Sequence, residues 1–434
     1  MMRNDFTNYG LILCLLSLMT TCVFAPISSQ TTKTNETNAQ MSWEQFRPIA
    51  KKLIKYDFVQ PFAEGLSAVR IGNNKTGKYG FIDKAFNEII PLKYDYASSF
   101  SEGLANVTIG GGETSKQGFI DRTGRKIIPS KFYDAYPFSE GLANVAIGNE
   151  KNAKYGLIDK TGREIIAPKY GFIFPFEEKF ARVTVGDFIT GKDGFIDRTG
   201  KEIIPAKYDD VLQFSEGLVA VAISKDELLK WGFVDETGKI IVPFKYEEAN
   251  PFTDGLALMK IGEYESGGYV LINKTGQEVI KLDYEVIFPF SEGLAAARLK
   301  TDVKNEWGFI DKTGKVILEL KYDLVVSFNE GMAQISNGRL KDRKWGFVDK
   351  TGREIVAPKY DLTGKFEKGV AKVFYRKGKN EFKFGYIDKT GKEIVAVKYD
   401  DTWCDAFRNE GFIGVTLNGK KGFVDLRGNE YFDF

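Results

Sequence analysis

The segment KWGFVDKTGREIVAPKYD, residues 344–361, decides the fold because it returns along the chain with little change. YGFIDKAFNEIIPLKYD at 79–95 and YGLIDKTGREIIAPKY at 155–170 are two further copies. The aromatic residue near the end of each copy gives the period, since Tyr322 and Tyr360 are 38 residues apart. A fixed internal pattern at such a period indicates a repeat architecture. The ten aromatic markers are Tyr56, Tyr94, Phe132, Tyr170, Tyr208, Tyr246, Tyr284, Tyr322, Tyr360 and Tyr399.

Two glycine positions repeat in phase with the aromatic marker. One belongs to segments like YGFID and WGFVD and occupies Gly80, Gly118, Gly156, Gly194, Gly232, Gly308, Gly346, Gly385 and Gly422, with Val270 as the exception. The other belongs to EGL-like segments and occupies Gly65, Gly103, Gly141, Gly217, Gly255, Gly293, Gly331, Gly369 and Gly411, with Lys179 in the missing place. Three markers in phase establish ten copies of one unit.

Within one unit, residues 194–223, the chemistry is that of β-hairpins. Residues 194–197 predict a short strand, and the following turn uses an Asp carboxylate and a Gly with positive φ. Residues 202–204 predict the returning strand, which Pro205 is expected to end because it lacks an N–H donor. Residues 218–223 predict the longest strand, with apolar side chains on both faces.

The expected fold class is therefore all-β, with ten tandem antiparallel β-meander repeats of about 38 residues, each of three or four strands. One meander is too small to be stable alone, so neighbours must stack. The first copy starts in the KYD half and the last ends after the GFVD hairpin, so we expect both terminal copies to be partial and to complete one unit together. That phase favours a propeller-like closed array, although propellers usually have about 4 to 8 blades. An open β-solenoid or superhelix is the alternative.

These motifs resemble the WG repeat family, also called KWG repeats, over residues 53–434. The resemblance implies a β-rich repeat scaffold for binding a protein or another ligand, of bacterial type and without an assigned biochemistry. Three copies depart from the pattern, because Gln117, Asp193 and Lys421 stand where the aromatic residue is expected. These departures put the local packing of those copies in question.

Composition excludes several function classes. The 61 basic and 59 acidic residues nearly cancel, so no overall field selects nucleic acid. There is no histidine, the commonest general base and metal ligand. Cys404 is the one cysteine after the leader, and we interpret it as a packing residue. We expect no catalytic residue, no metal ligand and no cofactor, and the binding residues stay unidentified at this point.

The amino terminus predicts export. Residues 1–26 form a signal peptide around the apolar run LILCLLSLM at 11–19, which is too short to span a bilayer as a helix. Residues 27–42 are polar and predict a disordered linker, and the repeat domain is expected over residues 43–434. The alternative to cleavage is a lipid anchor at Cys22, which alone would bring the chain to a membrane.

Two columns of acids recur, and both are interpreted as structural. The first is expected to cap the DxTG turns: Asp83, Asp121, Asp159, Asp197, Asp235, Asn273, Asp311, Asp349, Asp388 and Asp425. The second is expected to pair with lysines such as Lys93, Lys207 and Lys321: Glu64, Glu102, Glu140, Glu216, Glu292 and Glu330.

Function is therefore expected in what differs between copies. The variable connections are residues 225–230, 262–268, 300–306, 338–344 and 376–383, which should project from one face. Trp403, in an insertion, is either an exposed anchor or a cap for the last unit. We expect a non-catalytic, exported scaffold of the cell envelope or exterior that binds a protein or an envelope glycan. The alternatives are a glycoside hydrolase using two non-repeated acids and a purely structural spacer.

Overall fold

The computed structural model describes residues 41–111, 115–187, 190–225, 228–262, 268–298, 307–320, 322–338, 342–378, 381–404, 407 and 411–432. The predicted signal peptide, Cys22 and most of the linker lie outside these residues. The described part belongs to one compact unit that extends from Gln40 to Phe434. Within it we find no helix whose length and apolar character would let it cross a membrane.

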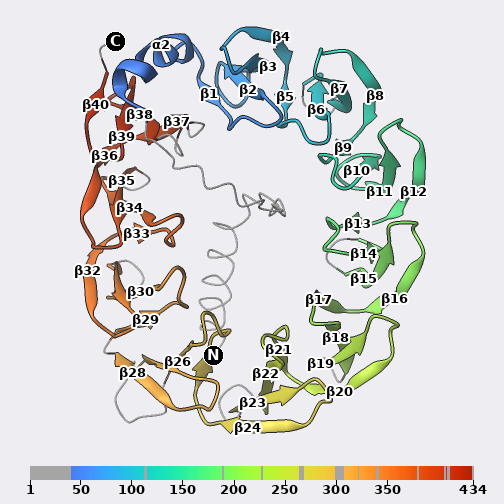
Figure 1. The fold of residues 1–434 in the computed structure, drawn as a ribbon. Helices are drawn as coiled ribbons and strands as arrows, with labels where there is room; N and C mark the ends of the chain where they lie inside the picture. Colours follow the sequence, from blue (N-terminus) through green and yellow to red (C-terminus); the bar gives the residue numbers. More distant parts are fainter. Residues whose placement is uncertain are drawn as a thin grey trace, which may run out of the picture. The chain divides into compact units, whose positions relative to one another are not determined.

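Each copy is a four-stranded antiparallel meander, and Figure 1 shows the copies following one another along the chain. The first strands are β1 (Phe58–Val59), β5 (Tyr96–Ala97), β9 (Asp134–Ala135), β13 (Phe172–Ile173), β17 (Asp210–Ser215), β21 (Glu248–Ala249), β25 (Val286–Ile287), β29 (Leu324–Val325), β33 (Leu362–Thr363) and β37 (Asp401–Cys404). The second strands are β2 (Leu66–Ile71), β6 (Leu104–Ile109), β10 (Leu142–Ile147), β14 (Phe180–Val185), β18 (Leu218–Lys225), β22 (Leu256–Ile261), β26 (Ala295–Arg298), β30 (Met332–Asn337), β34 (Val370–Arg376) and β38 (Phe412–Leu417).

The third strands carry the aromatic-glycine motif. They are β3 (Lys78–Asp83), β7 (Lys116–Asp121), β11 (Lys154–Asp159), β15 (Lys192–Asp197), β19 (Leu228–Asp235), β23 (Gly268–Asn273), β27 (Trp307–Ile310), β31 (Lys344–Asp349), β35 (Phe382–Asp388) and β39 (Lys420–Asp425). The fourth strands are β4 (Glu88–Tyr94), β8 (Lys126–Phe132), β12 (Glu164–Tyr170), β16 (Glu202–Tyr208), β20 (Ile240–Tyr246), β24 (Glu278–Leu282), β28 (Val316–Leu320), β32 (Glu354–Tyr360), β36 (Glu393–Tyr399) and β40 (Glu430–Tyr431). We number the copies 1 (β1–β4) to 10 (β37–β40).

The all-β class and the ten tandem meanders are confirmed. Two details differ from the expectation. Copies 1 and 10 both have four strands, because the unit begins after the marker tyrosine and not at the KYD segment. The fourth strand β16 also continues through Pro205 to Tyr208. Pro205 falls in a bulge of the ladder, so its missing N–H removes no ladder hydrogen bond.

That bulge explains the motif glycine. In seven copies, a Cβ on this glycine would lie 2.2–2.6 Å from a carbonyl oxygen of the fourth strand, as at Gly80, Gly118, Gly156, Gly194, Gly232, Gly346 and Gly385. Copy 6 tolerates Val270 because β23 and β24 pair there in regular register, with Val270 opposite Lys281. The glycine is therefore required by the close approach of the bulged strand.

The core lies between successive copies. Val219, Ala220, Val221 and Ala222 of β18 are almost fully buried, which confirms that both faces of the long strand are covered. Aromatic pairs such as Phe81–Phe100 and Phe233–Phe252 join each third strand to the next copy, with ring centroids 4.8 and 4.7 Å apart. Each copy thus completes the core of its neighbour, as repeat stacking requires.

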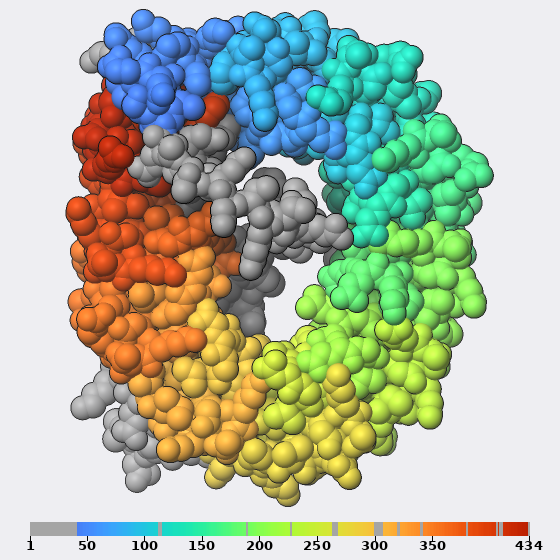
Figure 2. All heavy atoms as spheres, viewed as in Figure 1, coloured from blue at the N-terminus to red at the C-terminus, as the bar shows by residue number. Residues whose placement is uncertain are grey.

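Copies 1 and 10 meet as well, through a pairing of strands and through a helix. The first strands β1 and β37 pair in parallel at Val59 and Cys404, which merges copies 1 and 10 into one eight-stranded sheet. The helix α2 (Trp43–Leu53) packs over this junction (Figure 1). Figure 2 shows the blue helix next to the red last copy. We call this region, α2 with β1 and β37–β39, the junction.

α2 begins with a capping box and has one apolar face. Ser42 and Gln45 exchange hydrogen bonds between side chain and backbone at its first turn. Phe46, Ala50 and Leu53 lie on one face at helical spacing and are fully buried. Phe46 stacks on Phe412 of copy 10 at 4.2 Å, so the helix supplies apolar surface to the junction.

Candidate binding surface at the loop end

Antiparallel strands give every copy two ends of different character. At one end, the EG turn joins the first and second strands, and the DxTG turn joins the third and fourth strands. The two turns lie side by side because Leu104, which begins the second strand, pairs with Asp121, which ends the third. At the other end, the variable connection between second and third strands lies beside the link to the next copy. We call these the turn end and the loop end.

The turn end is built from repeated residues. The Asp121 carboxylate accepts hydrogen bonds from the Thr123 N–H, the Thr123 hydroxyl and the Arg125 N–H at 2.9, 2.6 and 3.0 Å. These bonds, the Thr123 hydroxyl first among them, hold the pKa of Asp121 below its usual value. Asn273 accepts the equivalent three bonds, so the interpretation of this column as turn caps is confirmed. Among the described residues no group of three acids or cysteines is arranged to hold a metal ion.

The glutamate column links one copy to the next. Glu102 and Gly103 both have positive φ, and together they form the two-residue turn between Ser101 and Leu104. The Glu102 carboxylate accepts from the Gly141 N–H of copy 3 at 2.8 Å and pairs with Lys160 at 3.0 Å. Burial raises the pKa of Glu102, but these donors outweigh it and the pKa is lowered.

Two of the lysine partners expected for this column, Lys93 and Lys207, are therefore wrong, and the third, Lys321, lies outside the described residues. The column pairs with lysines of the DxTG turns, as in Lys274–Glu216, Lys350–Glu292 and Lys389–Glu330. The KYD lysines instead lie over the neighbouring aromatic ring or pair along the fourth strands. Lys93 lies over Tyr94 at 5.2 Å, and Lys245 pairs with Glu278. The cause is geometric, since the glutamate lies in the turn between the first and second strands, whereas the KYD lysine lies on the fourth strand at the other edge of the sheet.

The loop end also has an ion pair between copies, found at six places within the described residues. A lysine at the start of the third strand reaches an acid that precedes the first strand of the next copy. The pairs are Lys78–Asp95, Lys192–Asp209, Lys230–Glu247, Lys344–Asp361, Lys383–Asp400 and Lys421–Asp57. The last of them runs from copy 10 to copy 1 and so continues the series across the junction.

The polar departures are matched by polar partners. Asp193 is buried and binds Arg182 at 2.7 Å and the Thr184 hydroxyl at 2.7 Å. Gln117 accepts from Asn106 and donates to Asp134. Lys421 makes the junction ion pair. Each polar side chain in an aromatic place therefore has a dedicated acceptor or donor, and the packing of these copies is preserved.

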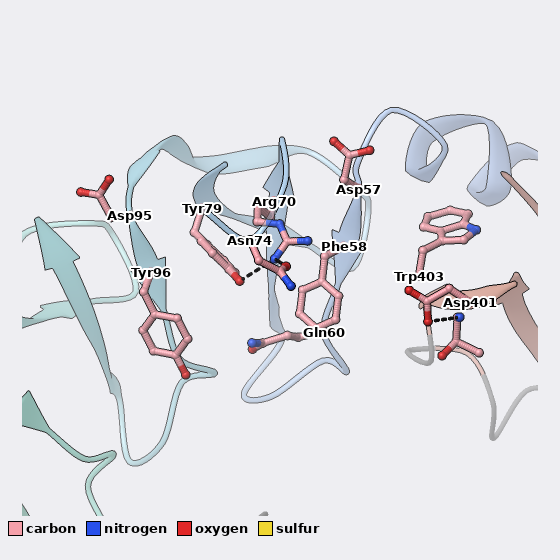
Figure 3. A pocket seen from close by; sticks show the side chains of 11 residues that line it. Asp57, Phe58, Gln60, Arg70, Asn74, Tyr79, Asp95, Tyr96, Asp401 and Trp403 are labelled. Atoms are coloured by element: carbon pink, nitrogen blue, oxygen red, sulfur yellow. Dashed lines mark hydrogen bonds between the residues drawn. The ribbon is translucent and has the colours of Figure 1, made fainter. Parts of the chain in front are cut away.

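A pocket of about 570 Å³ opens at the loop end of the junction (Figure 3). Copies 10, 1 and 2 all contribute to it. The lining is Asp57, Phe58, Gln60, Arg70, Asn74 and Tyr79 from copy 1, Asp95 and Tyr96 from copy 2, and Asp401, Thr402 and Trp403 from copy 10. A volume of this size lies within the range of small-molecule sites, roughly 300–1,000 Å³.

Two of the three acids in the pocket are already partnered. Asp57 accepts from the Gly72 N–H at 2.7 Å and from Lys421, and Asp95 accepts from the Gly110 N–H at 3.0 Å and from Lys78. Burial raises the pKa of Asp57, but the Lys421 and Gly72 donors outweigh it and lower the pKa. Asp401 is exposed and accepts from the adjacent Thr402 N–H.

Arg70 organises the middle of the pocket. Its Nε donates to the Gly72 carbonyl at 3.0 Å and its Nη1 to the Tyr79 hydroxyl at 3.1 Å. The guanidinium lies 5.4 Å from the Phe58 ring centre and 5.6 Å from that of Tyr79. These contacts fix a cation between two rings at the floor of the site.

Trp403 is a junction residue and not an exposed anchor. Its side chain is 4% exposed, and its indole N–H donates to the Val415 carbonyl at 3.1 Å. Its ring packs edge-on against Phe423 at 5.0 Å. Cys404 is buried beside it, which agrees with a packing role.

The variable connections are only partly described. The parts of these connections that lie outside the described residues are 226–227, 263–267, 300–306, 339–341 and 379–380. The described connection of copy 1, residues 72–77, reaches the pocket through Asn74. In copy 1, therefore, a variable connection contributes a side chain to the pocket.

The family comparison agrees with this repeat geometry. The family described as WG containing repeat matches ten times, at residues 53–75, 79–112, 118–150, 155–187, 194–224, 231–264, 271–300, 307–339, 345–378 and 384–420. The chain belongs to the WG repeat family. No curated protein matches the WG repeat chain at a significant level.

Solved structures show only distant likeness to the WG repeat chain. The crystal structure of the tricorn protease is 14% identical, with a TM-score of 0.23 over 86% of this chain and 44% of that one. The acylaminoacyl peptidase of Pyrococcus horikoshii is 12% identical, with a TM-score of 0.34 over 61% of this chain and 51% of that one. The WG repeat chain thus spans about half the length of these structures, and similarity this low carries no argument about function.

Sequence reasoning did not identify the pocket residues. Phe58, Arg70, Tyr96 and Asp401 each stand at a place where the copies differ, and this variation is the signal that marks them. The expected closed array would bring the two ends of the repeat region together, but it does not predict which side chains meet there, since Asp401 and Phe58 are distant in sequence.

Proposed function

We propose that the WG repeat chain is a non-catalytic binding scaffold that acts outside the cytoplasm and holds a protein or a cell-envelope glycan at its loop end. The observation that carries this proposal is that the turn end and the loop end of the copies are built from different kinds of residue. Repeated polar residues at the turn end are engaged in caps and in contacts between copies. Residues that differ between copies, such as Phe58, Arg70 and Asp401, contribute to the lining of the pocket at the loop end.

Closure of the ten copies into a propeller-like array is part of the proposal. Three contacts support it: the β1–β37 pairing, the apolar junction filled by α2, and the Lys421–Asp57 ion pair that continues the series between neighbouring copies. Closure removes exposed sheet edges that would otherwise pair with other chains. It also brings residues of copies 10, 1 and 2 to one site.

The glycoside hydrolase alternative lacks comparable support. It requires two acids in a pocket that the other copies do not have. Asp57 and Asp95 belong to one repeated column and both have lysine partners. Asp401 has acidic equivalents in Asp134, Asp210 and Glu248. Export rests on the apolar run at residues 11–19, as the sequence predicts.

The test is affinity capture from an envelope extract of the source organism. The purified chain is compared with a variant in which three loop-end connections are shortened: residues 72–77, which reach the pocket through Asn74, and residues 262–268 and 338–344. A matched control carries Ile240→Ser and Val279→Ser, two exposed positions on fourth strands. Capture of one protein or glycan by the intact chain and the control, but not by the shortened variant, supports the proposal. Equal capture by all three contradicts the assignment to the loop end.

A further inference from the structure

We infer that the pocket at the junction binds a neutral saccharide. This inference rests on the proposed function and adds to it a ligand class and a location. The argument has three parts: the charge of the pocket, the kinds of side chain that line it, and the copies from which they come.

The pocket is close to electrically balanced. Asp57, Asp95 and Asp401 contribute three negative charges, and Arg70, with the two lysines that pair with Asp57 and Asp95, contributes three positive ones. Such a site offers no net attraction to a phosphate, a polyanion or a basic peptide. A neutral ligand with many hydroxyl groups fits this balance better than a charged one.

The lining combines ring faces with groups that bind hydroxyls. Tyr96 is 44% exposed and Phe58 is partly exposed, and Figure 3 shows Gln60 between the two rings. A sugar ring has an apolar face of C–H groups and a rim of hydroxyls, so it needs aromatic surface beside amide, carboxylate or guanidinium groups. Gln60, Asn74 and Asp401 provide that polar rim around the two rings.

The aromatic walls are held in place before any ligand arrives. Tyr79 is buried and packs edge-on against Tyr96 at 5.7 Å, while its hydroxyl accepts from Arg70. Arg70 in turn lies against Phe58. A site whose rings are fixed by packing loses less conformational entropy on binding, which favours affinity.

The site exists only where copies 10, 1 and 2 meet. Asp401 comes from copy 10, Phe58 from copy 1 and Tyr96 from copy 2. A ligand that contacts all three binds the joined form and not a form in which copies 1 and 10 have separated. By linkage, saturating ligand therefore stabilises the junction.

The test uses the full chain on a printed array of neutral oligosaccharides, followed by calorimetric titration of the best-bound sugar. Tyr96→Ala and Asp401→Asn are the pocket variants, since both side chains are exposed and neither contributes to the apolar core of the junction. Ile147→Ala is the control, an exposed apolar residue 47% accessible at the end of β10 and outside the pocket. Thermal melting of each variant establishes that it is folded.

We expect at least one array sugar to bind, with affinity lowered about tenfold or more in each pocket variant and unchanged in Ile147→Ala. If both pocket variants bind the sugar with the affinity of the native chain, the pocket assignment is overturned but the scaffold function is not. An array without any bound sugar overturns the saccharide inference, and affinity capture then decides separately whether the chain is a scaffold. A captured protein whose retention depends on Tyr96 or Asp401 also overturns it, because the pocket would then recognise a polypeptide.

Discussion

The ammonium group of Lys421 donates to the Asp57 carboxylate and, at 2.8 Å, to the Tyr56 carbonyl oxygen. It joins the last copy to the first in the same manner as Lys78 joins copy 1 to Asp95 of copy 2. The lysine lies one residue later than in the other copies, in the place of the motif aromatic. This contact thus explains why Lys421 replaces the motif aromatic, and it links copy 10 to copy 1.

Replacing Lys421 by Met should loosen the junction without unfolding the chain. Both partners are partly exposed, so the pair itself contributes about 0.2–1 kcal/mol. Hydrogen exchange should become faster in α2 and β37 and remain unchanged in distant copies. Lys420→Met, at the exposed neighbouring position, is the control and should change neither.

The same pair has a predictable pH dependence. The pKa of Asp57 is lowered in the folded chain, since the Lys421 and Gly72 donors outweigh the opposing effect of burial. A lowered pKa means that the stabilisation is present above the unfolded value of about 3.9 and is lost as the pH falls through the folded value. The difference in exchange between native chain and Lys421→Met should therefore decrease as the pH falls below about 3.9 and through the lowered folded-state pKa of Asp57. A difference that does not decrease on acidification would contradict this assignment.

Phe46→Ala should be the most damaging single change in α2. Phe46 is fully buried among Phe407, Phe412 and Phe423, and truncating such a ring costs about 3–5 kcal/mol. The expected result in a thermal melt is earlier loss of the junction, followed by unfolding of the remaining copies. Arg47→Ala, on the exposed face of the same helix, should melt like the native chain. Equal melting of the two variants would mean that α2 does not hold the junction.

Gly232→Ala should destabilise copy 5 because its Cβ would lie 2.4 Å from the Val242 carbonyl oxygen. Overpacking of this kind costs about 1–3 kcal/mol, measurable by urea unfolding. Gly308→Ala is the matched substitution. In copy 7 the strands pair in regular register at this position, with Gly308 opposite Glu319, so we expect a smaller loss. The strand register at the glycine, bulged in copy 5 and regular in copy 7, should therefore determine how much stability the substitution costs.

Asp235 tests the turn caps. Its carboxylate accepts from the Thr237 hydroxyl, the Thr237 N–H and the Lys239 N–H, and the Thr237 hydroxyl makes the largest contribution to its lowered pKa. Asp235→Asn should keep these bonds, as Asn273 does, whereas Asp235→Ala should lose them and be less stable at pH 7. The native carboxylate accepts these bonds as an anion, which Asn does not, so the native chain should be slightly more stable than Asp235→Asn at neutral pH. Because the pKa of Asp235 is lowered in the folded chain, this difference in stability should narrow as the pH is lowered from about 4 through the folded-state pKa. Melting temperatures across that range provide the measurement.

Much of the fold was predictable because each copy is built from local signals. The turn chemistry of Asp197 to Gly200 and the apolar run of residues 218–223 predict two hairpins, and both are present. The first strands were missed because most are only two residues long and carry no alternation. α2 was missed because it is the one helix among the described elements and contains Pro48, which argues against a helical segment.

The pocket was not predictable because its lining comes from copies 1 and 2, which are adjacent in sequence, and from copy 10, which is at the other end of the chain. Asp95 follows Tyr79 closely, but Trp403 is more than three hundred residues away from both. The irregular features near the carboxyl end, Lys421 and the insertion at 402–404, were visible in the sequence. Their meaning depended on the partner that they meet, which a single sequence does not reveal.

The junction also determines the order in which parts of the chain fold during synthesis. Contacts between successive copies close short loops, so each copy can form as soon as the next one is present. The bridge between Val59 and Cys404 joins residues that leave the ribosome at opposite ends of synthesis. The apolar face of α2 therefore lacks its partners from copy 10, such as Phe412, until the last copy has been made. A chain truncated before residue 400 would keep its hairpins and leave Phe46 exposed, a feature that chaperones and proteases recognise.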